Sequence, residues 1–136
     1  NFNSPYKATS VGNFWKRWHI SLSSWVRDYV YKTVFATTRS AALAAILTML
    51  IFGLWHEVSF RYIAWGAYHG VGIAIWQWFQ GWKSSIPVPR GGAWRYVWHG
   101  VSIFVTFHFV AFSFVLVLEP DLHAARAVFA ELLVVF

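Results

Sequence analysis

Two of the six histidines in this chain occupy positions where an ionisable side chain is costly. His56 ends an apolar segment, and His69 lies inside the next one. Imidazole loses hydration when it leaves water, so such residues at membrane depth are rare and often functional. Histidine is the usual base that takes the proton of a hydroxyl group during nucleophilic attack. The alternative for each histidine is a buried or interfacial hydrogen-bonding role, since polar side chains also join membrane helices.

The composition indicates a membrane protein. Hydrophobic residues make up 58% of the 136 residues and charged residues only 12%, whereas soluble domains average roughly 25% charged. The absence of cysteine excludes disulfides, thiolate metal sites and cysteine nucleophiles. The net charge of +6 arises from basic residues that flank apolar segments, which favours membrane topology and anionic lipid over nucleic acid. We expect a piece of a longer protein, without a signal peptide.

Helices must position these histidines. The stretch 14–31 has apolar residues at three- and four-residue spacings with basic residues interleaved, which predicts an amphipathic helix that lies at the membrane interface or re-enters it. Ser10 is expected to cap this helix, and His19 and Ser23 would share a face. The other predicted elements are membrane segments at 40–56, 60–82 and 94–118, a loop at 83–93 and a further helix at 122–136.

The positions of lysine and arginine predict the orientation of these segments. Basic residues are concentrated before the first segment and in the loop after the second, and the positive-inside rule places both in the cytoplasm. The turns at 56–60 and 119–121 then face outward. His19 is therefore expected near the inner surface and His56 near the outer one. Glycines at 66, 70 and 72 are expected to let another helix approach closely.

Two blocks of sequence stand out. The first comprises Phe2–Tyr6, Ser10, Phe14–Ser23 with its Arg17-Trp18-His19-Ile20-Ser21-Leu22-Ser23 run, and Trp25–Tyr31. The second comprises Gly53-Leu54-Trp55-His56 and Trp65–Gly70. Both blocks resemble the membrane-bound O-acyltransferase family, in particular its bacterial branch of alginate O-acetylation and teichoic-acid D-alanylation proteins. The blocks occur in the family's order, and the resemblance covers residues 1–82 most fully and 94–130 more loosely.

The resemblance implies an all-α polytopic membrane protein, with a ring of helices around a thin centre that a tunnel crosses. It implies that His56 is catalytic and that His19 is the second functional histidine. Such proteins transfer an acyl group from an activated donor to a hydroxyl. The sequence departs from the family at Glu57, where a glycine usually follows the catalytic histidine. It also has Lys32-Thr33-Val34-Phe35 where alginate-type members have Pro-Leu-Gly-Gly.

Further residues are expected to border the substrate path. The indole N–H of Trp55 or Trp65 would orient substrate, unless these side chains are packing or interface anchors. Arg27 and Asp28 would form an internal ion pair or contact lipid headgroups. His69 is expected to line the second membrane segment. The substrate and tunnel residues predicted in this way are Trp18, Ser23, Arg27, Asp28, Trp55 and His69.

No metal site is predicted, since no histidine or carboxylate pairing has metal-ligand spacing. His99, His108 and His123 belong to no motif and are expected to be structural. No tightly bound cofactor is expected. The donor would be an acyl thioester, carried on coenzyme A or on a carrier protein.

The sequence therefore predicts a fragment of a multi-pass acyltransferase of the bacterial cytoplasmic membrane, with His56 as the general base. It would O-acylate, and by expectation O-acetylate, an extracytoplasmic polysaccharide or cell-wall polymer. Its expected partners are membrane lipid, the rest of its own chain and an extracytoplasmic acetyl-transfer protein, with no nucleic acid. Transfer of D-alanine from a carrier protein is the second enzymatic interpretation. A proton-coupled transporter with a histidine relay is the alternative from another class, although a relay requires neither motif block.

Overall fold

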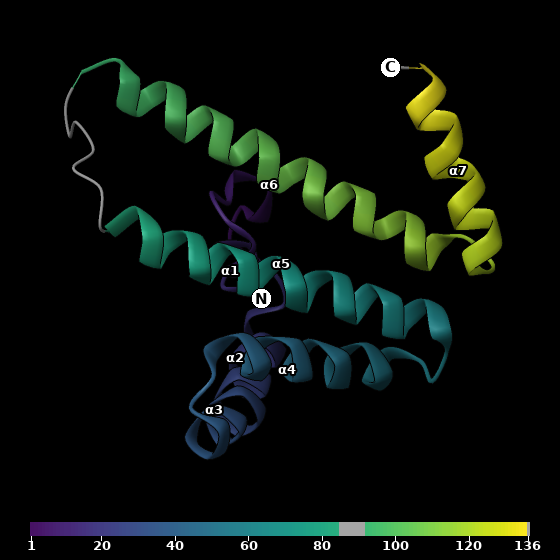
Figure 1. The fold of residues 1–136 in the computed structure, drawn as a ribbon, viewed down its shortest axis with the longest axis horizontal. Helices are drawn as coiled ribbons and strands as arrows, with labels where there is room; N and C mark the ends of the chain where they lie inside the picture. The colour runs from purple at the N-terminus through teal and green to yellow at the C-terminus, as the bar shows by residue number, and fades with distance from the viewer. Residues whose placement is uncertain (85–91, 136) are drawn as a thin grey trace.

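The computed structural model describes residues 1–84 and 92–135, and all regular structure within these ranges is helical (Figure 1). The central part of the predicted loop at 83–93 and the last residue of the predicted helix 122–136 lie outside the described residues. The elements in order are η1 (Pro5–Lys7), α1 (Val11–Trp15), α2 (Ile20–Val26), the π-helical turn η2 (Arg27–Tyr31), α3 (Lys32–Thr38), α4 (Ala41–His56), α5 (Phe60–Ser84), α6 (Trp94–Leu118) and α7 (Leu122–Val135).

Three helices, α4, α5 and α6, run antiparallel in succession with α5 between the other two (Figure 1). The hydroxyl of Ser40 caps α4 by accepting the Leu43 N–H at 3.2 Å, and Glu57 leaves that helix in an extended conformation. The predictions of helices at 40–56, 60–82 and 94–118 are confirmed. Among the described helices, only α6 is long and apolar enough to cross a membrane, with a mean hydropathy of 2.4. Of the three predicted membrane-spanning segments, the structure thus supports the one that forms α6, and the other two stay predictions.

Glycines let α4 and α5 pack backbone against backbone. A Cβ atom at Gly53 would overlap the carbonyl oxygen of Tyr62, and a Cβ at Gly66 or Gly70 would overlap the α4 backbone. Gly72 faces a phenylalanine side chain of α6. The prediction that the glycines of the second segment allow a close helix approach is confirmed.

The predicted continuous helix over 14–31 is wrong, because the chain breaks after Trp15. Helix α1 is capped by Ser10, as predicted, through a hydrogen bond from the Asn13 N–H at 3.0 Å. His19 then adopts a left-handed conformation, with φ 49°, immediately before α2. Left-handed backbone is uncommon in residues other than glycine, so this position is a specific local feature of the fold.

The first three residues of the chain cause this break. The Asn3 N–H donates to the Arg17 carbonyl at 2.9 Å, and the Ile20 N–H donates to the Asn1 carbonyl at 2.9 Å. These bonds take the place of hydrogen bonds that a continuous helix would make. The apolar spacing persists across the break because both short helices turn their apolar sides to one core.

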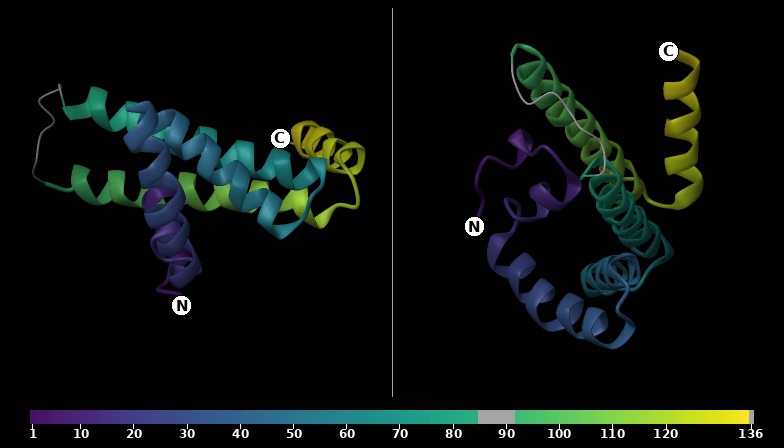
Figure 2. Two further views of the ribbon diagram at one scale, coloured as in Figure 1. Left: turned by 90° about the horizontal axis from the view of Figure 1, so that it is seen from below. Right: turned by 60° about the vertical axis from the view of Figure 1, so that its left-hand side comes forward.

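The N-terminal elements pack across one face of the layer formed by α4, α5 and α6 (Figure 2). Helix α1 lies against α5 and α6, whereas η2 and α3 form a curved arm that crosses α4. The buried core between them contains Val26, Met49, Phe52 and Trp65, with Trp15 packed against it. The broken N-terminal region is therefore part of the core that surrounds the motif residues.

Candidate functional site

His56 is the last residue of α4, and its side chain is exposed. Aromatic rings surround it, with ring centroids at 5.2 Å for Phe52, 5.7 Å for Trp65 and 5.7 Å for Tyr62. Neither ring nitrogen of His56 has a hydrogen-bond partner within the part of the chain that the structure describes. The imidazole is thus held by ring packing while both nitrogens remain available to a substrate.

His19 lies at the break between α1 and α2. Its Nδ1 is 3.2 Å from the side-chain amide nitrogen of Asn1, and the Phe2 ring packs beside it at 5.7 Å. An amide nitrogen can only donate, so Nδ1 accepts this hydrogen bond and a neutral His19 carries its proton on Nε2. Asn1 also accepts the Ser21 N–H at 2.9 Å, which fixes the start of α2. Sequence reasoning missed Asn1, because nothing in a lone polar residue indicates contacts with residues so far along the chain.

The region of His19 also contacts α6, because the ring of the neighbouring Trp18 reaches Phe114 with centroids 6.5 Å apart. The prediction that His19 and His56 lie near opposite membrane faces stays a prediction.

The two turns predicted to face the same side do lie together. The Arg61 guanidinium donates to the Glu57 carboxylate at 2.8 Å and to the Glu119 carbonyl at 3.1 Å. The hydrogen bond from Arg61 lowers the pKa of the Glu57 carboxyl below its usual value. Glu57, the departure from the family's glycine, thus joins the turn after His56 to the turn after α6.

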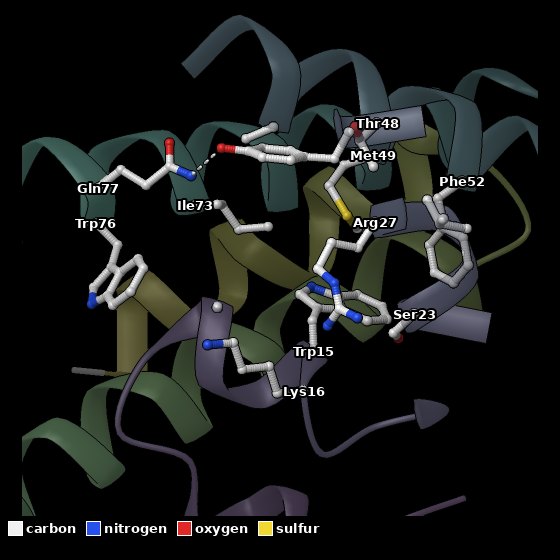
Figure 3. Close-up of a pocket in the computed structure, with 14 residues that line it drawn as sticks. Trp15, Lys16, Ser23, Arg27, Thr48, Met49, Phe52, Ile73, Trp76 and Gln77 are labelled. Carbon is white, nitrogen blue, oxygen red and sulfur yellow. Dashed lines mark hydrogen bonds between the residues drawn. The ribbon is translucent and has the colours of Figure 1, made fainter. Parts of the chain in front are cut away.

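A cavity of about 200 Å³ lies between the N-terminal elements and the α4–α5 hairpin (Figure 3). Its walls are mainly apolar, with Trp76 at one end and Phe52 at the other. Lys16 and Arg27 add two positive charges to the lining. Because Phe52 also contacts His56, the cavity is separated from the candidate base by one side chain.

Two buried polar atoms of the cavity lining have no hydrogen-bond partner among the described residues, Thr48 Oγ1 and Gln77 Oε1. The other end of the Gln77 amide donates to the Tyr31 hydroxyl at 3.4 Å (Figure 3). Buried polar groups are almost always paired in folded proteins, so these atoms are available to a bound molecule. Sequence reasoning missed both residues, since each is a single polar side chain inside a helix and belongs to no motif.

Only two of the six predicted substrate-path residues line this cavity, Ser23 and Arg27. Trp55 is 62% exposed and stacks on the outer side of Phe52. Trp18 packs against the ring of Phe14.

The predicted ion pair of Arg27 and Asp28 forms, with 3.2 Å between Nε and Oδ1. Both side chains are partly exposed, and Lys32 is a third member at 2.9 Å. The hydrogen bond from Lys32, and to a lesser extent the one from Arg27, lowers the pKa of the Asp28 carboxyl. The predicted ion pair is therefore present and partly exposed in the described structure, and its assignment as an internal pair or a headgroup contact stays a prediction.

His69 is 1% exposed and lies behind Trp15 rather than in the cavity wall. Its hydrogen bonds to Trp15 and Ser113 join three helices. Among the described residues, no three histidine, aspartate or glutamate side chains come close enough together to hold a metal ion.

Comparison with known proteins identifies the family. The model of the membrane-bound O-acyltransferase family matches residues 1–116, which include both motif histidines and all residues that line the cavity. The chain belongs to the membrane-bound O-acyltransferase family.

Relatives within this family act on different polymers. The chain is 50% identical over 82 residues to the probable alginate O-acetylase AlgI of Pseudomonas aeruginosa, which covers 55% of this chain and 15% of that protein. It is 33% identical over 124 residues to the teichoic acid D-alanyltransferase of Bacillus subtilis, covering 84% of this chain and 31% of that protein. It is 31% identical over 133 residues to the peptidoglycan O-acetyltransferase of Helicobacter pylori, covering 94% and 24%. The chain therefore spans less than a third of each relative.

Proposed function

We propose that the whole protein containing this chain is a multi-pass O-acyltransferase of the bacterial cytoplasmic membrane. It moves an acetyl group from an acyl thioester to a hydroxyl of an extracytoplasmic polysaccharide or cell-wall polymer. The observation that carries this proposal is His56, an exposed imidazole held by aromatic rings with both nitrogens unbonded in the described structure. Membership of the family and the polymer-modifying relatives support it.

In this proposal His56 takes the proton of the acceptor hydroxyl as its oxygen attacks the thioester carbonyl carbon. The tetrahedral intermediate then expels the thiolate, which breaks the carbon–sulfur bond and leaves the acetyl ester on the polymer. The imidazolium of His56 returns its proton to the thiolate. His19, with its Nδ1 occupied by Asn1, donates a hydrogen bond from its Nε2–H to the developing oxyanion and keeps its proton.

The cavity suits the donor end of this reaction. Its apolar walls would hold the uncharged part of a thioester, and Lys16 and Arg27 would attract an anionic carrier group. Thr48 and Gln77 would complete their hydrogen bonds with polar groups of the donor arm. Phe52 would then separate the donor arm from the base by the width of one ring.

The test is acetyl transfer to the native polymer in membranes that carry the whole protein at matched abundance. His56→Ala should lower the rate by roughly 100-fold or more, the usual size of a general-base effect. His123→Ala, which changes a histidine of α7 outside both motifs, is the matched control and should leave transfer unchanged. Normal transfer by His56→Ala would rule out the general-base assignment.

Transfer of D-alanine is the second candidate, because the Bacillus subtilis D-alanyltransferase matches 84% of this chain. A D-alanyl group carries an ammonium, however, and Lys16 in the cavity lining would repel it. We therefore favour the uncharged acetyl group. Offering both donors to the same membranes decides between them, and preferential incorporation of D-alanine would reverse the assignment.

A further inference from the structure

His69 is the most deeply buried ionisable group of the described structure, in the middle of α5. Its ring contacts four aromatic side chains, with centroids at 4.8 Å for Trp65, 5.2 Å for Trp15, 5.5 Å for Phe109 and 5.7 Å for Tyr68. All of these neighbours are uncharged, so nothing around the ring favours a protonated imidazole. The side chain is nonetheless polar, and its role must come from its two nitrogens.

The hydrogen bonds of His69 have only one consistent direction. An indole N–H can only donate, so Trp15 Nε1 donates to His69 Nδ1 at 3.3 Å. The neutral imidazole then carries its proton on Nε2 and donates it to Ser113 Oγ at 2.9 Å. The Ser113 hydroxyl in turn donates a hydrogen bond to the Val110 carbonyl at 2.6 Å. This chain joins α1, α5 and α6, and every polar atom in it has a partner.

Trp15 connects this hydrogen-bonded chain to the candidate base. Its ring lies 5.2 Å from Phe52 and 5.8 Å from Trp65, and these are two of the rings that enclose His56. Trp15 also lines the cavity, in the wall that the N-terminal elements form. The orientation of one indole therefore sets both the cavity wall and the packing around His56.

We propose that His69 is a positioning residue for acyl transfer, which fixes the Trp15 indole through Nδ1 and thereby holds the Phe52 and Trp65 rings against His56. The inference rests on the proposed function and adds a residue that contacts neither substrate nor reacting atoms. An apolar side chain of equal size would fill the same space but could not fix the rotation of the indole. Hydrogen bonding of the indole N–H is what makes the orientation specific.

Four variants of the whole protein test the proposal, with kcat and KM measured for acetyl transfer per amount of folded protein. His69→Leu keeps the volume but removes both bonds, and it should lower kcat by roughly 10- to 100-fold, as expected for a small misplacement at a distance from the chemistry. KM should stay close to that of the parent. His69→Gln restores an acceptor and a donor and should recover most of the loss. His108→Leu is the control, because His108 bonds only the Phe104 carbonyl of its own helix.

Trp15→Phe provides the fourth variant and a double-mutant cycle. It keeps an aromatic ring, although a smaller one, and removes the N–H, so it should lower kcat at least as far as His69→Leu does. The double variant Trp15→Phe/His69→Leu should be no worse than the more impaired single variant, because all three lack the same bond. Should His69→Leu fail to accumulate, Trp15→Phe and His69→Gln carry the comparison.

Three results would overturn the proposal: parental kcat in His69→Leu or in Trp15→Phe, no recovery in His69→Gln, or losses that multiply in the double variant. Each leaves the proposed function intact as long as His56→Ala is inactive. Full activity of His56→Ala would instead overturn the proposed function itself. The two failures are therefore distinguishable.

Discussion

The two histidines of the second motif block have opposite surroundings. His69 is buried, and both of its nitrogens are occupied by partners from other helices. His56 is exposed at a helix end, and both of its nitrogens are unbonded in the described structure. A general base needs a free nitrogen to reach its substrate, whereas a positioning residue needs both nitrogens engaged. Under the two proposed roles, hydrogen-bond occupancy rather than depth in an apolar segment is what distinguishes the two histidines.

The largest effect should come from placing the same amide at both positions. An amide reproduces a donor and an acceptor but cannot take up a proton at neutral pH. His56→Gln should therefore lose acetyl transfer by roughly 100-fold or more, while His69→Gln should keep most of it. Transfer rates in membranes at matched abundance check this difference. Equal losses in the two variants would break the comparison.

A second prediction concerns the first histidine motif. His19→Gly relieves the left-handed backbone at φ 49° while removing the imidazole. We expect transfer to fall by roughly 10- to 100-fold, at or below the cost of one oxyanion donor, with protein abundance unchanged or higher. His123→Ala is again the control. Parental transfer by His19→Gly would show that only His56 acts on the substrate.

The stability of the α4–α5 hairpin, which carries His56 and His69, should be sensitive to one added methyl group. Gly53→Ala forces α4 away from the Tyr62 carbonyl, and such overpacking costs about 1–3 kcal/mol. We expect less folded protein and a lower midpoint in thermal unfolding in detergent. Gly100→Ala in α6 is the matched control, because the described structure leaves open space there. Equal stability of the two variants would contradict the close approach of α4 and α5.

A smaller effect is expected at the cavity. Thr48→Val replaces an unpaired buried hydroxyl with a methyl group of the same shape. If the donor bonds this hydroxyl, the KM for the donor should rise roughly 2- to 10-fold, the net worth of one hydrogen bond, with kcat unchanged. An unchanged KM would remove Thr48 from the donor site. The unfolding temperature, measured without donor, shows whether the substitution changes the stability of the protein itself.

The smallest effect is expected at Glu57. Its pKa is lowered in the folded protein by the hydrogen bond from Arg61, so its contribution to stability is present above the usual carboxyl pKa and is lost as pH falls through the lowered value. Glu57→Gln should remove this part of the acid sensitivity, and Glu57→Gly should keep transfer activity at neutral pH. Unfolding midpoints at neutral and acidic pH check the sign. A variant more acid-sensitive than the parent would contradict it.

The sequence predicted the elements whose signals are local. The uncharged apolar run after Ser40 and the turn before Phe60 place α4 within a residue or so of the prediction. The break at His19 was missed because it is caused by Asn1 and Asn3, which bond residues some distance along the chain. Apolar periodicity cannot reveal such a break when both halves face one core.

Only part of the candidate site could be predicted, again because only local signals are visible in a sequence. His19, Ser23 and Arg27 belong to the first motif block, and His56 belongs to the second. The partners of His69 are Trp15 and Ser113, which are distant in sequence on either side, and a single chain gives no signal for such pairings. Thr48 and Gln77 became visible only as unpaired atoms in a folded cavity.

The glycine contacts between α4 and α5 also imply an order of assembly. These helices are separated by three residues, Glu57–Ser59, so their contacts close a very short loop at low entropic cost. The hairpin can therefore form while α6 is still being synthesised. Ser113 arrives with α6, so the bond from His69 to its hydroxyl can form only after that helix has been made. Until α6 packs on the hairpin, the Nε2–H of His69 lacks its Ser113 acceptor, and this unpaired donor favours the docking of α6.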